Sequence, residues 1–103
     1  ASAAVDQAKD GGFTPLYIAC QNNHVEIAQL LLEAGAAISQ AMNRGVTPLH
    51  VACQNNHLDT ARLILEAGAA PDQARNDGAT PLFAACYNGH LEVAKLLSSW
   101  GAA

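Results

Sequence analysis

One segment of eleven residues occurs three times in this chain, each time 33 residues after the last. It reads TPLYIACQNNH from Thr14, TPLHVACQNNH from Thr47 and TPLFAACYNGH from Thr80. The flanking residues repeat as well, which divides the chain into 5–37, 38–70 and 71–103. A fixed period of this size predicts a solenoid, in which each unit packs mainly against its neighbours. We therefore expect 1–103 to form one domain of three stacked repeats.

Each repeat begins with the signals of a short helix. Thr14 is placed to cap a helix, and Pro15 follows at the first helical position, where a missing N–H costs nothing. The helix is predicted over 15–22 and ends before Asn23, a residue type that accepts the left-handed conformation. The equivalent residues in the other repeats are Thr47, Pro48, Asn56 and Thr80, Pro81, Gly89.

A second helix is predicted over 25–34 and its equivalents, where apolar residues recur at helical spacing. Glu26 lies in its first turn, where the helix dipole favours negative charge, and Gly35 stops it. The stretch 36–46 is polar and contains glycine, so it reads as an extended turn leading to the next repeat. Helices this short are marginal alone, so their apolar faces must pack against the next repeat.

The 33-residue period, together with Thr-Pro-Leu-His-x-Ala from Thr47, carries a specific resemblance that covers nearly the whole chain. The chain resembles the ankyrin repeat family. The resemblance implies an all-α solenoid of three helix-turn-helix repeats, with projecting turns and a concave face made of turn tips and first helices. Met42 and Arg75 stand where an Asp commonly opens the turn, so the turn chemistry is expected to differ. Stacked side chains of Gln7, Gln40 and Gln73 are expected to supply replacement hydrogen bonds.

The resemblance further implies a scaffold that binds a partner protein through the concave face. Phe13, Arg44 and Tyr87 are residue types that often anchor interfaces. The expected contact residues are Asp10, Gly11, Phe13, Gln21, Asn22, Asn43, Arg44, Val46, Gln54, Asn55, Asn76, Asp77, Ala79, Tyr87 and Asn88. An engineered or consensus-like scaffold with no dedicated partner is the alternative, because Gln-Asn recurs at the equivalent positions 21–22 and 54–55 and makes this surface uniform.

The histidines have a structural role in the resemblance. His24, His57 and His90 are expected to brace neighbouring repeats by hydrogen bonds. His50 is expected to bond the Thr hydroxyl near the start of its helix, a bond that Phe83 cannot make.

A cysteine stands four residues before a histidine in each repeat, at Cys20, Cys53 and Cys86. A structural zinc needs four ligands, and stacked repeats about 8–10 Å apart cannot gather them around one ion. A catalytic Cys–His pair needs a unique orienting acid, which a motif repeated three times does not offer. Metal binding and catalysis therefore remain remote alternatives, and no cofactor is expected.

Net charge and cysteine use bear on partners and location. The net charge is −4 and no run of Lys or Arg occurs, so neither nucleic acid nor a membrane is expected as partner. Cysteines at repeat-locked positions are typical of reduced, helix-packing residues in an intracellular, cytoplasmic protein. The chain opens on Ala, and we expect a processed or excised piece. The first repeat lacks a polar outer face, so self-association through it is expected.

Overall fold

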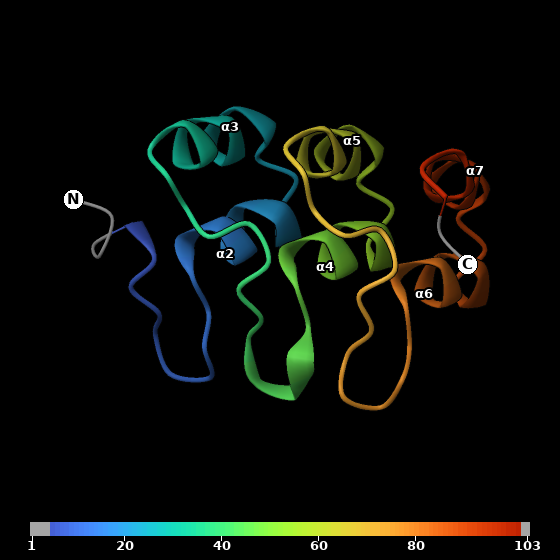
Figure 1. The fold of residues 1–103 in the computed structure, drawn as a ribbon, viewed down its shortest axis with the longest axis horizontal. Coiled ribbons are helices and arrows are strands. Elements are labelled where there is room, and N and C mark those ends of the chain that lie inside the picture. Colours follow the sequence, from blue (N-terminus) through green and yellow to red (C-terminus); the bar gives the residue numbers. More distant parts are fainter. Residues whose placement is uncertain (1–4, 102–103) are drawn as a thin grey trace.

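The computed structural model describes residues 5–101 and shows three helix pairs in a row along the longest axis (Figure 1). The pairs are α2 (Pro15–Gln21) with α3 (Val25–Glu33), α4 (Pro48–Gln54) with α5 (Leu58–Glu66), and α6 (Pro81–Tyr87) with α7 (Leu91–Ser99). A short 3-10 helix, η1 (Asn43–Gly45), lies in the second turn. Within 5–101 the only β pairing is an isolated bridge between Lys9 and Phe13. The predicted all-α solenoid is confirmed.

The three repeats form two rows of helices and one row of turns. The first helices α2, α4 and α6 make the middle row, the second helices α3, α5 and α7 lie on one side of it, and the turns project on the other (Figure 1). Helix α4 packs against both α2 and α6, and α5 packs between α3 and α7. Each repeat therefore contacts mainly its neighbours, as a solenoid requires.

The first helices begin at the threonines that the sequence indicated. The hydroxyl of Thr14 accepts the backbone N–H of Tyr17 at 3.2 Å, and Thr47 and Thr80 accept equivalent bonds at 3.1 Å. Each helix ends one residue earlier than predicted, and a left-handed residue follows the cap: Asn23, Asn56 and Gly89, with φ of 60°, 63° and 73°. The predicted threonine caps and the left-handed residues that end the first helices are therefore confirmed.

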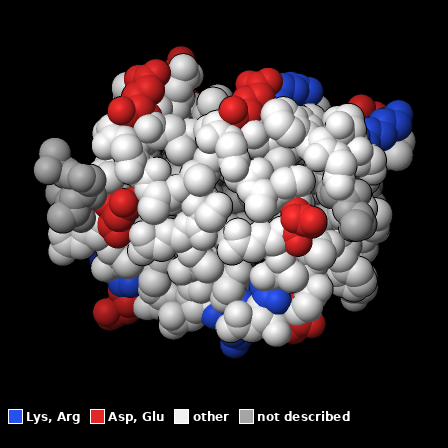
Figure 2. Space-filling view, in the orientation of Figure 1, with Lys and Arg blue, Asp and Glu red and all other residues white. Residues whose placement is uncertain are grey.

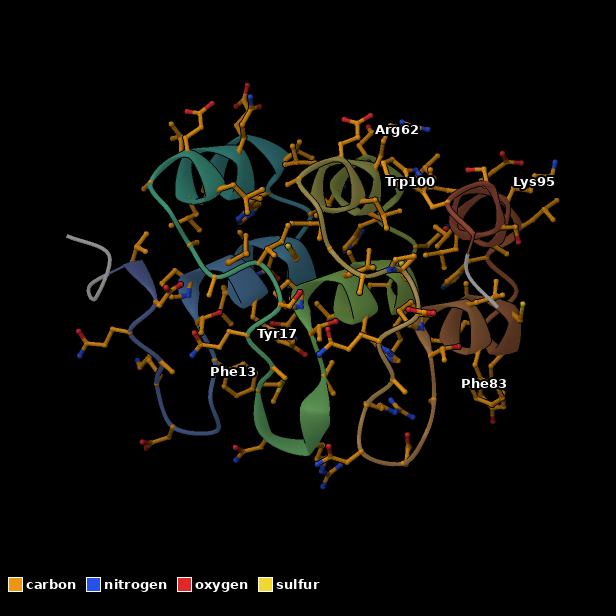
Figure 3. All side chains as sticks on the ribbon, viewed as in Figure 1. Phe13, Tyr17, Arg62, Phe83, Lys95 and Trp100 are labelled. Carbon is orange, nitrogen blue, oxygen red and sulfur yellow. The ribbon has the colours of Figure 1, made fainter. Side chains whose placement is uncertain are left out.

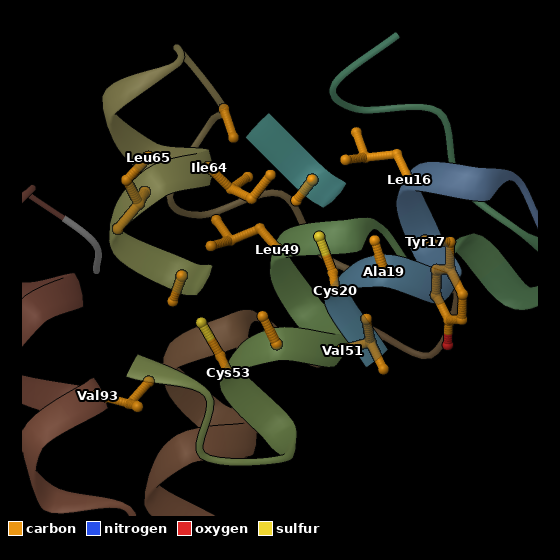
Figure 4. Packing of buried hydrophobic residues seen from close by; sticks show 14 of the residues in the cluster. Leu16, Tyr17, Ala19, Cys20, Leu49, Val51, Cys53, Ile64, Leu65 and Val93 are labelled. Atoms are coloured by element: carbon orange, nitrogen blue, oxygen red, sulfur yellow. The ribbon is translucent and has the colours of Figure 1, made fainter. Parts of the chain in front are cut away.

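The core is a seam of apolar side chains between the two helix rows (Figure 4). Leu16 and Leu49 occupy the same position of successive repeats and are fully buried, as are Ile64, Val93 and Leu97. All six residues from Pro48 to Cys53 are buried, because α4 has a neighbour on each side. Burying one large aliphatic side chain contributes about 1.5–3 kcal/mol relative to exposure, so the extensive burial in the middle repeat stabilises the array.

Hydrogen bonds from histidine side chains cross between repeats. The Nε2 atoms of His57 and His90 lie 2.9 Å from the carbonyl oxygens of Gln21 and Gln54 in the preceding repeat. The bracing role expected of these two histidines is confirmed. In repeat one, His24 is exposed and makes no side-chain hydrogen bond within the described residues.

Two expectations about polar side chains are wrong. The His50 ring is fully buried with neither nitrogen bonded, and only its backbone N–H reaches the Thr47 hydroxyl. The backbone N–H of Phe83 makes the same bond, so all three caps are equivalent. Gln7, Gln40 and Gln73 are exposed and form no ladder of hydrogen bonds in 5–101; the turns are closed by their own backbone instead.

Candidate protein-binding groove

Each repeat ends in a projecting hairpin, and we call residues 9–13, 42–46 and 75–79 the turn tips. The first N–H of each tip donates to the carbonyl of the fifth residue at 3.0 Å, from Lys9 to Phe13 and at the two equivalent places. A second bond of 2.9–3.0 Å closes the turn inside each tip, such as Gly12 N–H to the Lys9 carbonyl. The backbone thus holds the tips in shape without the aspartates typical of this turn.

Neighbouring tips are joined to each other by backbone hydrogen bonds. Asn43 N–H donates to the Gly11 carbonyl at 3.0 Å, and Asn76 N–H donates to the Arg44 carbonyl at 2.8 Å. The contact is close enough that a Cβ on Gly12 would lie 3.0 Å from the Met42 Cα. The three tips therefore form one continuous wall along the array.

A groove of about 740 Å³, the concave groove, lies between this wall and the first helices. Apolar side chains line part of it, and amide side chains line the part next to α2 and α4. The lining residues are Gly11, Tyr17, Gln21, Met42, Asn43, Arg44, Val46, Val51, Gln54, Asn55, Arg75, Asn76 and Asp77. A smaller hollow of about 150 Å³ shares Gln54 and Arg75 with it and is lined further by Phe83, Ala84, Tyr87 and Asn88. The concave groove and its extension together reach all three repeats.

The structure brings most of the predicted contact residues together. Nine of the fifteen line the concave groove: Gly11, Gln21, Asn43, Arg44, Val46, Gln54, Asn55, Asn76 and Asp77. Tyr87 and Asn88 line its extension, and Ala79 lines a neighbouring hollow with Phe83. Asp10 and Phe13 line a hollow on the outward face of repeat one, and Asn22 is exposed outside all of these.

Four groove residues were absent from the sequence-based set: Tyr17, Met42, Val51 and Arg75. Tyr17 and Val51 belong to the core and reach the groove only with part of their side chains. Arg75 carried a usable signal, because it stands at the first residue of a turn tip in place of the typical Asp.

Charged side chains in the groove differ in how they are neutralised. The Arg75 Nε lies 2.8 Å from the Asp77 Oδ1, and this bond raises the pKa of Arg75 and, with the Ala79 N–H, lowers that of Asp77. Arg44 forms no ion pair within 5–101. Its backbone is left-handed, with φ of 73°, which costs a non-glycine residue about 1–2 kcal/mol.

Phe13, Tyr17 and Phe83 lie on this side of the molecule (Figure 3), and each belongs to one of two aromatic pairs. Phe13 and Tyr17 meet edge to face with ring centroids 5.5 Å apart, and Tyr17 is buried. Phe83 and Tyr87 stack at 5.9 Å and are 56% and 81% exposed. The second pair exposes apolar surface to solvent, whereas the first serves mainly to pack α2 against its turn.

The Cys–His pairs do not converge on a site. Among the described residues no three His, Cys, Asp or Glu side chains gather where they could hold a metal ion. Cys20, Cys53 and Cys86 form no disulfide. Burial raises the pKa of the Cys20 and Cys53 thiols to about 12, so neither is a nucleophile at neutral pH. In the part of the chain that the structure describes, no helix has the length and apolar character needed to cross a membrane.

Comparison with known proteins agrees with this architecture. Profiles described as ankyrin repeats (3 copies) match residues 1–75 and 37–103. Over 31 residues the chain is 52% identical to the E3 ubiquitin-protein ligase XBAT32 of Arabidopsis thaliana, and 55% identical to the E3 ubiquitin-protein ligase mind-bomb of Drosophila melanogaster. These stretches cover 30% of this chain but only 6% and 2% of the two ligases. The chain belongs to the ankyrin repeat family.

Proposed function

We propose that this chain is a protein-binding scaffold that holds its partner in the concave groove. The observation that carries the proposal is the groove itself, which runs over three repeats between the hydrogen-bonded tips and the first helices. Most residues on such a surface are not needed to pack the core, so they can vary with the partner. A role in recognition also fits the ligase relatives, where the shared stretch is about one repeat within a much longer chain.

The proposal excludes an enzyme. Cys20 and Cys53 pack in the core and His57 and His90 brace neighbouring repeats, which supports a structural use of these residues. Cys86 and His24 are exposed. Buried free thiols at Cys20 and Cys53 also support the proposed intracellular, cytoplasmic location. The twelve predicted contact residues that line the groove, its extension and the neighbouring hollow are proposed as the contact surface, with Arg75 and Tyr17 added to them. Asp10, Phe13 and Asn22 lie outside this surface and are proposed only as its surroundings.

The test is affinity capture from a lysate of the source organism with three immobilised forms of the protein. The groove variant carries Arg44→Ala and Tyr87→Ala, and the control variant carries Gln29→Ala and Arg62→Ala on the second helices. We expect a partner retained by the wild type and by the control and lost from the groove variant. Loss from the control alone would move the site to the opposite face. A capture that no variant changes would favour the alternative of a consensus-like scaffold without a dedicated partner.

A specific observation supports a second candidate, self-association through repeat one. Ile18 is 38% exposed and Ile27 50% exposed, whereas Val51 and Thr60 at the same positions of repeat two are 5% and 0% exposed. Ile18 and Ile27 line a hollow of about 850 Å³ together with Phe13 and Leu31. In repeats two and three the preceding repeat covers the equivalent face. In repeat one this apolar face is exposed, and exposed apolar patches favour association with another molecule.

A further inference from the structure

The turn tips carry both signs of charge, with a slight excess of positive charge because Asp10 and Asp77 stand beside three basic residues, although the chain as a whole is acidic (Figure 2). Three of the five basic residues lie in the tips: Lys9, Arg44 and Arg75. Five of the nine acidic residues lie on the second helices: Glu26, Glu33, Asp59, Glu66 and Glu92. The side of the molecule that carries the concave groove is therefore its least acidic side.

Arg44 is the charged group in the groove that lacks an internal partner. It forms no salt bridge with any described residue and lies in the groove wall. The equivalent residue of repeat one is Gly11, which adopts the same left-handed backbone, with φ of 90°, at no steric cost. Arg44 thus keeps an unfavourable conformation where glycine would relax it. Strain of this kind, at an unpaired side chain in a groove, points to a role in binding.

Arg75 adds a second guanidinium on the adjacent tip. Its Nε is used by Asp77, which fixes the side chain, while its terminal nitrogens have no bond within the described residues. The two tips are tied by the bond from Asn76 N–H to the Arg44 carbonyl. Guanidinium groups present donors in a geometry that matches a carboxylate, so this stretch of wall is suited to an acidic side chain.

Beyond Arg75 the groove gains aromatic surface beside the polar side chains of Gln54 and Asn88. Its extension is lined by Phe83 and Tyr87, whose stacked rings are largely exposed. Exposed aromatic rings beside an arginine are typical of interface anchors. A segment that crosses the arginines therefore meets an aromatic surface next.

We infer that the concave groove takes a protein segment with an acidic residue, whose carboxylate pairs with Arg44 and Arg75, followed by an apolar residue that packs on Phe83 and Tyr87. The inference rests on the proposed function and names the chemistry of its partner. Asp77 in the wall and the overall charge of −4 repel any anion, and they disfavour a polyphosphate, with its several charges, more than a segment with one carboxylate.

The test uses an array of nonapeptides in which the central residue is fixed and all other positions are randomised. The centres are Glu, Asp, Gln, Asn, Lys, Leu and Phe, and labelled single-stranded DNA is an additional probe. We expect the acidic centres to bind the protein about fivefold better than their amide counterparts, since one exposed charge pair contributes no more than that. The preference should weaken as salt is raised.

Three variants separate a role in binding from a role in folding. Arg44→Gly should abolish the preference for acidic centres while leaving the thermal unfolding midpoint unchanged or raised, because glycine relieves the strained backbone. Arg44→Gln, which keeps the length but not the charge, should also abolish it. Arg62→Gln is the matched control. This variant removes only the exposed ion pair between Arg62 and Asp59 on α5, so it should keep the preference for acidic centres.

An array with no preference for acidic centres would overturn the inference, and so would a preference that survives both changes at Arg44. Either result leaves the proposed function standing if binding still depends on Tyr87. Tight binding of the DNA probe would replace the acidic peptide by a phosphate ligand. Binding that depends on Arg62 and not on Arg44 or Tyr87 would instead contradict the concave groove as the site.

Discussion

His50 lies in an environment that its residue type does not prefer. Its ring is fully buried, and both nitrogens lack a hydrogen-bond partner. Burial lowers its pKa, the Arg75 charge lowers it further, and Asp77 opposes them. The neutral ring is therefore the form that the folded protein accepts, and protonation favours the unfolded chain.

This environment predicts a pH-dependent stability that His50→Leu removes. The unfolded pKa is 6.5 and the folded pKa lies below it, so the contribution is intact above pH 6.5 and is lost as the pH falls below it. Between pH 7.5 and 5 the wild type should lose at most about 2 kcal/mol more than the variant. Urea unfolding of both proteins across this range measures the difference, and parallel stability curves would contradict it.

Single residues also show where sequence reasoning stops. Thr14 and Gly35 act through neighbours in the chain, so the helix start and stop were readable from the sequence. The orphaned ring of His50 depends on how the third tip packs over the second repeat, which no local pattern encodes. Arg75 differs from His50, because its replacement of the typical Asp was visible in the sequence, and only its place in the groove wall depends on the stacking of the tips.

At the scale of the turn tips, two glycines with the same conformation have different roles. Gly12 has φ of 85° and Gly78 has φ of 91°. A Cβ on Gly12 would lie 3.0 Å from the Met42 Cα and 3.2 Å from the Asn43 nitrogen, both backbone atoms. A Cβ on Gly78 would meet nothing within 4 Å. The sequence could not tell them apart, since both occupy the same repeat position.

The comparison predicts that Gly12→Ala destabilises the protein more than Gly78→Ala. Both changes place alanine in a left-handed conformation and should cost about 1–2 kcal/mol. Gly12→Ala should cost about 1–3 kcal/mol more, because the wall formed by the first two tips must open. Denaturant unfolding gives both values. Equal losses would show that the tips do not support each other.

At the scale of the whole molecule, the period of 33 residues was enough to predict the architecture. Three Thr-Pro starts and the glycines at 35, 68 and 101 fix the number and the order of the helices. The groove could be predicted only as a face, through the family resemblance. Its depth and its continuation toward Tyr87 depend on the hydrogen bonds between tips, which join residues more than thirty positions apart.

Equivalent apolar positions of repeats one and two differ in how far they are exposed to solvent. Repeat two covers its Val51 and Thr60 with repeat one, while the counterparts Ile18 and Ile27 remain open to solvent in 5–101. Leu30, on α3 with Ile27, is exposed as well, whereas its repeat-two counterpart Leu63 is half-buried. Apolar surface that the fold normally covers favours association with a second copy or local opening.

We expect the weight-average mass in sedimentation velocity to rise with protein concentration, and amide exchange to be faster in α2 and α3 than in α4 and α5. Ile27→Glu should abolish the association, because it places a charge in the hollow of the outward face. Gln29→Glu is the matched control, since it adds the same charge to the exposed side of the same helix and should leave the association unchanged. A wild-type protein that stays monomeric at all concentrations, with repeat one as slow to exchange as repeat two, would show that this face is stable when open to water.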